Sequence, residues 1–431
     1  MLVRTWTWWA GLYGLPRAYI MLQAKRGEPL ARYILAAESN GDTDMFIEQL
    51  RDRGPLARGR NLSVTVDHAL ATAILRDRRF SAMVPSRDAR ARPIQWLIDK
   101  SDPGLPNPIA APSMLRVDPP DHTRYRRLVT KHFSVSAIEK LQTDISEETD
   151  RLIDALATLV RPDLMRDFAA VLPVAVIATV LGAPEELRSR LSAWGVGAAA
   201  LLDLCPSWPA FRTAVDTLAD GMTYFDGHIR YLRENPSRSI LGELVSDGGL
   251  DPRELLTNTA LLLGAGSETT VNLLGNGIVA LHQHRDQLEH LRAEPQLWPN
   301  AIEEILRYDS PVQVTARMAT MDVTVENQDI SKGTVVLILL GGANHDPDVF
   351  ADPYRFDVAR KNAKAHLSFG NGVHTCLGSS LARMEGAAAL RALYDRFEDV
   401  QLDTTPQRRP TVNIHGFRSL PATLVRSSRT V

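Results

Sequence analysis

The chain has 431 residues, of which 44% are hydrophobic, so it can bury a large core. Its formal net charge is −2, from 49 basic and 51 acidic residues, and this balance argues against nucleic acid or an acidic polymer as a partner. Its 2 cysteines, Cys205 and Cys376, are too few for a disulfide framework or a four-cysteine iron–sulfur cluster, and they indicate a reducing compartment.

The N-terminus combines aromatic and basic side chains. Trp6, Trp8 and Trp9 lie close together, and Arg4 and Arg17 interrupt the apolar run. We predict no signal peptide, because no small-residue cleavage site follows, and no run of about 20 apolar residues could span a membrane. We expect residues 1–43 to form a helical extension that packs on the body of the protein. Contact of this Trp- and Arg-containing segment with a membrane surface is the alternative.

The next elements follow from periodicity and capping residues. Residues 16–37 and 45–54 have apolar side chains at helical spacing, whereas residues 62–66 alternate as in a strand. Asp67 follows this strand and can cap the next helix. Residues 86–112 contain several prolines and little periodicity, which predicts a long loop of the kind that is often functional.

A Pro-Pro step precedes the next helix. His122 and Arg126 lie four residues apart after Asp118-Pro-Pro, so they share one helical face that suits an anion such as a carboxylate. From these residues alone, a solvated basic surface is the favoured explanation of the pair. From residue 136 to about 235 the period is almost wholly helical, and Cys205 lies in a proline-rich break, where we interpret it as structural or incidental.

A long helix is predicted from Asp251-Pro-Arg-Glu to about Leu281, with Asp as its cap and Pro in its first turn. It is apolar on most sides, which places it in the centre of the protein. Gly264 and Gly266 lie inside it, and each costs about 1 kcal/mol relative to alanine. Two explanations remain open: close packing of a neighbouring helix, or a local opening that admits a small ligand.

The following helix carries two candidate ion pairs. Arg307 lies three residues after Glu304 and four after Glu303, and spacing does not distinguish them. Short alternating segments at 323–325 and 335–339 then predict strands. The fold class expected from these elements is mainly α with a small β region.

Cys376 lies in a glycine-containing loop, residues 369–378, that leads into a helix. The helix N-terminus should stabilise an anion, so the thiol is expected to ionise and become a metal ligand. A buried free cysteine and a phosphate-binding loop are the other interpretations, but a lone Gly-x-Gly without a following Lys-Ser/Thr is a weak phosphate signal. The complete pattern, F-G-x-G-x-H-x-C-x-G, resembles the haem-ligand loop of the cytochromes P450.

The resemblance spans roughly Asp44 to Leu424, with five motifs in the family's order. It implies a single cytochrome P450 domain, residues 44–431, with haem b between the long central helix and the cysteine loop. Cys376 would bind the iron, while His122, Arg126, Arg317 and His374 would contact the haem propionates. Matching positions of the cysteine loop and of the helix groove would also contact haem: Ala265, Gly266, Phe369, Gly370 and Gly378.

The same resemblance assigns the remaining candidates. Thr269 would hydrogen-bond oxygen at the iron, and Glu268 would relay protons. The match to E-x-x-R selects Glu304 and Arg307 as a buried structural pair. Four residues are expected to line the substrate pocket: Val312, Gln313, Val314 and Ile414.

The implied activity is a cytoplasmic monooxygenase that hydroxylates a small apolar substrate with O2. Because the sequence holds no reductase domain, electrons would come from a separate ferredoxin-like donor with its reductase. We expect Arg360, Lys361, Lys364 and Arg383 to form the donor's docking surface. Oxidative coupling, desaturation or a peroxide-driven reaction would use the same iron. A haem-based gas or redox sensor is the alternative from another class, and a missing output module argues against it.

Overall fold

The structure is a computed structural model that describes residues 2–59, 62–83, 92–105, 107–204 and 206–426. It is predominantly helical, and its described strands form one five-stranded and two two-stranded sheets, as expected from the sequence. Cys205 lies outside the described residues. None of the helices in the described ranges is long and apolar enough to cross a membrane.

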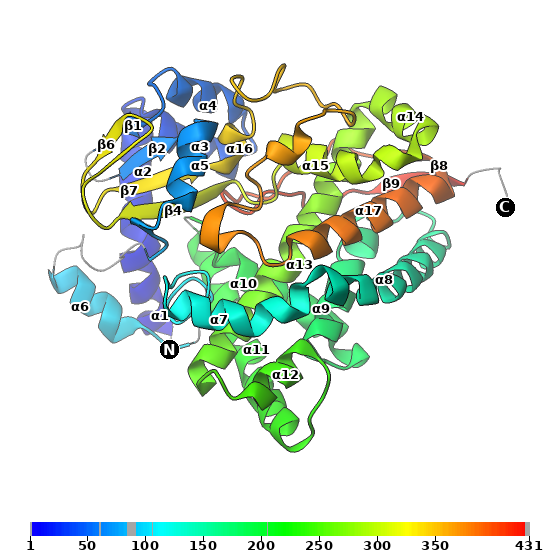
Figure 1. The fold of residues 1–431 in the computed structure, drawn as a ribbon, viewed down its shortest axis with the longest axis horizontal. Helices are drawn as coiled ribbons and strands as arrows, with labels where there is room; N and C mark the ends of the chain where they lie inside the picture. The colour runs from blue at the N-terminus through cyan, green and yellow to red at the C-terminus, as the bar shows by residue number, and fades with distance from the viewer. Residues whose placement is uncertain (1, 60–61, 84–91, 106, 205, 427–431) are drawn as a thin grey trace.

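Helix α13 (Pro252–Gln283) runs through the middle of the molecule (Figure 1). Its start is the predicted one: the Asp251 carboxylate accepts a hydrogen bond from the Glu254 amide at 2.8 Å, and the Glu254 carboxylate accepts one from the Asp251 amide at 2.9 Å. Other helices surround it: α7 (Asp121–Thr130), α8 (Val135–Leu156), α9 (Val171–Leu181), α10 (Arg188–Ala200), α11 (Trp208–Glu234), α12 (Ile240–Asp247), α14 (Arg285–Ala293), α15 (Trp298–Tyr308) and α17 (Ser379–Arg396).

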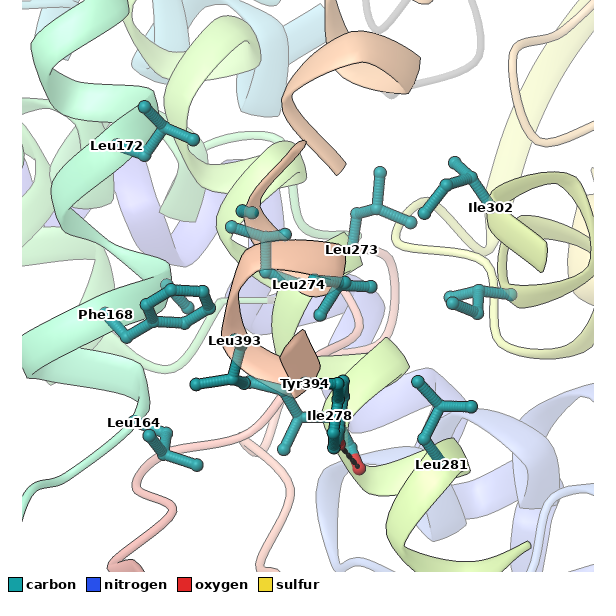
Figure 2. Close-up of a cluster of buried hydrophobic side chains, with 14 of the residues drawn as sticks. Leu164, Phe168, Leu172, Leu273, Leu274, Ile278, Leu281, Ile302, Leu393 and Tyr394 are labelled. Atoms are coloured by element: carbon teal, nitrogen blue, oxygen red, sulfur yellow. Dashed lines mark hydrogen bonds between the residues drawn. The ribbon is translucent and has the colours of Figure 1, made fainter. Parts of the chain in front are cut away.

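The largest hydrophobic cluster forms where α13 meets α9, α15 and α17 (Figure 2). Each leucine or isoleucine fully buried there contributes about 1.5–3 kcal/mol. This packing holds α13 rigidly against α17, the helix that follows the cysteine loop. The labelled side chains of Figure 2 are Leu164, Phe168, Leu172, Leu273, Leu274, Ile278, Leu281, Ile302, Leu393 and Tyr394.

The larger sheet lies on the side of the molecule formed mainly by the N-terminal helices (Figure 1). Its strand order is β1-β2-β7-β4-β3, and only β2 and β7 are parallel. The strands of this sheet are β1 (Ala57–Arg58), β2 (Leu62–Thr65), β3 (Phe80–Ser81), β4 (Val314–Ala319) and β7 (Val335–Leu339). Two antiparallel pairs complete the β structure: β5 (Val323–Val325) with β6 (Gln328–Ile330), and β8 (Phe397–Leu402) with β9 (Ala422–Arg426).

The N-terminal part is helical in α1 (Leu2–Trp9), α2 (Leu15–Lys25), α3 (Pro29–Glu38) and α4 (Asp44–Arg51). Two further helices flank the sheet: α5 (His68–Arg76) and α16 (Leu340–Ala343). Asp67 caps α5, as predicted, by accepting a hydrogen bond from the Leu70 amide at 2.7 Å.

The predicted loop at 86–112 is wrong in part, because α6 (Arg92–Ser101) forms within it. Ile98 of this helix is buried against the N-terminal helical segment. A long-range contact thus stabilises a helix that local periodicity did not indicate. Residues 84–91 and 106 of the same stretch lie outside the described residues.

Candidate active site

A cavity of about 1260 Å³ extends along α13 between the cysteine loop, α7 and β4. Single-ligand pockets commonly have volumes of about 300–1,000 Å³, so this cavity has room for a large cofactor and an organic ligand together. Much of its wall is aliphatic. From α9, for example, it includes Pro173, Val176, Ile177 and Val180.

The Cys376 side chain lines this cavity, in the loop that packs on the end of α5. Gly370 and Gly372 adopt φ values of 65° and 71°, which favour glycine. A Cβ on Gly372 would also lie 2.3 Å from the Leu75 carbonyl oxygen, so a larger residue would push the loop off α5. The Cys376 amide donates to the Phe369 carbonyl at 2.8 Å and closes the loop.

Desolvation raises the pKa of the Cys376 thiol, because its accessible side chain faces the cavity rather than the outer surface of the protein. A hydrogen bond from the Gly378 amide and the charges of Arg126 and Arg383 oppose this effect without overcoming it. Desolvation thus opposes the effect expected from the helix N-terminus, and ionisation of the thiol stays a prediction. A coordinated metal cation reverses this balance, since it deprotonates the thiol that binds it.

Four nitrogen-bearing side chains from three elements also line the cavity: His122 and Arg126 of α7, Arg317 of β4, and His374 of the cysteine loop. The rings of His122 and His374 lie 4.2 Å apart between centroids, and the Nε2 atoms of both are buried without a hydrogen-bond partner among the described residues. Burial lowers the pKa of both imidazoles, to about 3 for His374.

The two arginines of this group are also desolvated. Burial lowers the pKa of Arg126, and it lowers that of Arg317 to about 10. Within the described part of the chain, neither guanidinium forms an ion pair with a carboxylate; Arg317 donates only to the Thr315 hydroxyl and the Ala316 carbonyl. Desolvated cations, together with imidazole nitrogens that lack a hydrogen bond, fit an anionic ligand such as the two propionates of haem.

Helix α13 contributes Ala265, Gly266 and Thr269 to the cavity wall. The Thr269 hydroxyl donates to the Ala265 carbonyl at 2.7 Å. Helix α13 is continuous through this stretch, so the structure favours close packing as the explanation of the glycines. A Cβ on Gly264 would lie 2.7 Å from the Ala198 Cβ, and one on Gly266 would lie 3.1 Å from the Ile177 Cδ1.

Comparison with known proteins agrees with this geometry. The sequence model described as Cytochrome P450 matches residues 233–417. The chain is 39% identical to the "Putative cytochrome P450 140" of Mycobacterium tuberculosis, over 96% of this chain and 97% of that relative. It is 36% identical to the cytochrome P450 monooxygenase PikC of Streptomyces venezuelae, over 86% and 89%. The chain belongs to the cytochrome P450 family.

Solved P450 structures match most of the chain. Mycobacterium smegmatis CYP164A2 superposes with a TM-score of 0.80 and 32% identity, over 92% of this chain and 99% of that one. P450BioI, in its complex with an acyl carrier protein, gives a TM-score of 0.79 and 33% identity, over 88% and 98%. The P450 fold predicted from the sequence is therefore confirmed, and the chain is a haem-dependent P450 monooxygenase.

The predicted proton relay, Glu268, is not among the residues that line the cavity. Glu268 is buried on another side of α13, where its carboxylate accepts a hydrogen bond from the Arg409 guanidinium. Burial raises the pKa of Glu268, and Arg409 opposes this shift. Arg409 also donates from Nε to the Phe417 carbonyl at 3.1 Å. Sequence reasoning missed Arg409, because it lies 141 positions from Glu268 in a segment without periodicity.

Three of the four predicted pocket residues line the cavity: Val312, Val314 and Ile414. Val312 and Ile414 face one another in an isolated β-bridge. The prediction for Gln313 is wrong: its side chain donates to the Ser310 carbonyl at 2.7 Å and contacts His415. Neighbouring residues of an extended segment point to opposite sides, so Gln313 turns away where Val312 and Val314 turn in.

The Glu304–Arg307 pair is fully buried. The guanidinium donates to both carboxylate oxygens, at 2.7 and 2.9 Å, and to three backbone carbonyls. Arg360 joins this network, with its Nε 3.2 Å from the Glu304 carboxylate and its exposed fraction only 8%. The prediction that Arg360 belongs to a donor-docking surface is therefore wrong.

Glu303, the alternative partner, binds elsewhere. Its carboxylate accepts from Arg383 at 2.8 Å and lies 3.0 Å from the ring of His366. These contacts hold the pKa of Glu303 near 2, even though burial alone would raise it.

Proposed function

We propose that this P450 hydroxylates an apolar organic substrate with O2, using haem b and electrons from a ferredoxin-like donor with its reductase in the cytoplasm. Residues 44–431 would form the catalytic domain. One observation carries the proposal: a single cavity brings the Cys376 thiol and the α13 residue Thr269 together with Arg126, Arg317, His122 and His374. Among the described residues the two arginines form no ion pair, and the Nε2 atoms of the two histidines have no hydrogen bond, with the Asp118 carboxylate 3.9 Å from that of His374.

In this proposal Cys376 binds the iron as a thiolate, and Arg126 and Arg317 pair with the haem propionates. His122 and His374 donate their unpaired Nε2–H groups to the same carboxylates. The charge of the propionates would offset the desolvation of both arginines. Haem bound in this way supplies an iron whose thiolate ligand favours O–O bond cleavage.

The distal residues would handle protons. The Thr269 hydroxyl lies on the cavity wall and can exchange its bond to the Ala265 carbonyl for one to a ligand in the cavity. Glu268 would supply protons from the protein side once its carboxylate leaves Arg409 or connects to Thr269 through water. Its raised pKa, caused by burial, suits a group that must hold a proton. The aliphatic walls orient the substrate and exclude bulk water.

An apolar substrate of lipid, steroid or polyketide type fits the cavity lining. Similar proteins support this class. The polyketide biosynthesis cytochrome P450 PksS of Bacillus subtilis is 37% identical over 72% of this chain. Solved neighbours include P450BioI with an acyl carrier protein ligated to hexadec-9Z-enoic acid, P450epoK with epothilone B, and CYP109E1 with testosterone.

For the electron donor, Lys361 and Lys364 remain as candidate docking residues, because both are exposed beside the segment that leads to the cysteine loop. Arg383 is only partly available, since it pairs with Glu303. Reversal of both lysine charges should slow reduction by the donor, whereas reduction by dithionite should stay unchanged. Equal reduction by the donor in the variant and the wild type would remove this surface from the proposal.

The deciding experiment is the difference spectrum of the dithionite-reduced protein with and without carbon monoxide. A Soret band shifted far to the red establishes a thiolate opposite the gas. A band at the shorter wavelength of histidine-ligated haem would contradict the assignment of Cys376. NADPH consumption that depends on the donor and yields product then separates the enzyme from a sensor.

A further inference from the structure

The N-terminal segment, defined here as residues Leu2–Lys25 (α1, the π-helical turn Ala10–Gly14 and α2), packs directly on the helices that border the cavity. Trp8 is only 8% exposed, and its ring lies 5.3 Å from that of Phe211 on α11. Tyr13 approaches the same phenylalanine at 5.4 Å. Figure 1 shows α1 beside α6, and α1 also contacts α11.

Specific contacts fix this position. The Trp9 indole donates from Nε1 to the Pro206 carbonyl at 2.9 Å, and the Arg4 guanidinium donates to the Asp102 carbonyl just after α6. A Cβ on Gly11 would lie 2.5 Å from the Ile98 Cγ1, so a glycine is required for the turn to touch α6. The segment is therefore fitted to α6 and α11 rather than loosely attached.

Three side chains of this segment, Trp8, Leu12 and Tyr13, line the same cavity as Cys376 and Thr269. Beside them, α6 contributes Ile98 to the wall. Leu12 and Tyr13 stay partly exposed although they join the hydrophobic cluster, because one side of each faces the cavity. The extension that precedes the proposed catalytic domain thus supplies part of the substrate site.

We propose that Trp8, Leu12 and Tyr13 are specificity-determining residues that close the cavity between α6 and α11 and limit the length of the apolar substrate. This inference rests on the proposed function. It predicts that the chain prefers elongated apolar molecules whose far end contacts an aromatic wall. Short substrates held near the haem would not sense these residues.

A series of 1-alkylimidazoles, from butyl to dodecyl, tests in the haem-loaded protein whether Trp8, Leu12 and Tyr13 limit the length of a bound ligand. The imidazole binds iron and shifts the Soret band, while the alkyl chain extends into the cavity. Affinity should rise roughly fourfold for each methylene that becomes buried, and it should level off where the chain meets the wall. The measured quantity is the chain length at which the increase stops.

Trp8→Ala should move this limit to longer chains, and Leu12→Trp should move it to shorter ones, with butylimidazole affinity unchanged in both. Trp6→Ala is the matched control, because Trp6 lies on the same helix but is 52% exposed and does not line the cavity. If Trp8→Ala fails to retain haem, the chain-length limit measured in Leu12→Trp still tests the inference. An identical length limit in wild type and Leu12→Trp, with the red-shifted carbon monoxide band intact, would overturn the inference. Absence of that band from the wild type would overturn the proposed function, and the inference with it.

Discussion

Two groups of buried arginines in this protein differ in how their charge is satisfied. Arg307 is 0% exposed, yet its guanidinium binds the Glu304 carboxylate and three backbone carbonyls. Arg317, at 7% exposed, reaches one hydroxyl and one carbonyl and forms no ion pair among the described residues. Arg126 also lacks a carboxylate within the described chain.

The difference separates structure from ligand binding. A buried charge with every donor paired belongs to the scaffold, because removing its partner leaves an uncompensated charge. A buried charge without a counter-ion is unfavourable in the protein alone and becomes favourable when an anionic ligand arrives. The network on α15 therefore joins this helix to the segment 344–360, whereas the cavity arginines are the proposed partners of the haem propionates.

The largest effect is expected for the iron ligand. Cys376→Ser should abolish product formation and the red-shifted carbon monoxide band, because a neutral hydroxyl is a poor substitute for a thiolate. Stability of the apoprotein should change little, since the side chain faces the cavity. Cys205→Ser is the control and should retain the band. A normal band in Cys376→Ser would assign the iron to another residue.

The next largest effect is expected for the stability provided by the buried Glu304–Arg307 pair. Glu304→Ala should lower the free energy of unfolding by about 3–5 kcal/mol, because it strands the charge of Arg307. Urea unfolding of the apoprotein measures this. Asp395→Ala removes an exposed ion pair with Arg391, where both side chains are more than half exposed, and it should cost less than about 1 kcal/mol. Equal losses of unfolding free energy in the two variants would show that the buried pair is no more important to stability than the exposed one.

Loss of a cavity arginine should have the opposite effect on the stability of the apoprotein. Arg317→Leu should leave the apoprotein as stable as the wild type, or more so, because it removes an unpaired buried cation. Its haem affinity should fall roughly 10- to 100-fold, the equivalent of a charge-assisted hydrogen bond of about 1.5–3 kcal/mol. Haem transfer to apomyoglobin measures the affinity. Destabilisation of the apoprotein as large as that of Glu304→Ala would show that Arg317 is structural.

A smaller effect is expected at Thr269. Thr269→Ala should reduce product formed per NADPH consumed by about tenfold and release peroxide instead, since the hydroxyl no longer holds a proton at the cavity wall. Ser267→Ala is the control, because Ser267 makes a comparable bond to the Leu263 carbonyl, at 2.7 Å, away from the cavity. Unchanged coupling in Thr269→Ala would remove its assigned role.

The last prediction concerns His345, a scaffold imidazole whose Nδ1 lies 2.9 Å from the Gly341 carbonyl. Burial lowers its pKa to about 4, whereas the unfolded chain titrates near 6.5. The folded state then binds fewer protons, so the free energy of unfolding falls as the pH drops from about 6.5 to 4, by at most about 1.4 kcal/mol per unit. His345→Gln should flatten this slope in apoprotein unfolding. A slope equal to that of the wild type in His345→Gln would contradict this account.

Much of the site could be predicted from the sequence, because its signals are local. The cap at Asp251 and the glycine loop before Cys376 each depend on residues close together in the chain. For Arg307, the match to E-x-x-R rather than the spacing selected Glu304 over Glu303. The pattern around Cys376 also identified the P450 family, and with it the fold. The cavity then gathered His122, Arg126, Arg317 and His374 as the motifs implied.

Only the tertiary structure decided where individual side chains point and which partners they find. Gln313 turns out of the cavity, Arg360 is buried beside Glu304, and Arg409 reaches Glu268 from a distant segment. Helix α6 forms where its Ile98 packs on Gly11. All of these depend on contacts between residues far apart in sequence, whose free energy local patterns do not encode. For the same reason, only the folded chain places Trp8 in the cavity wall.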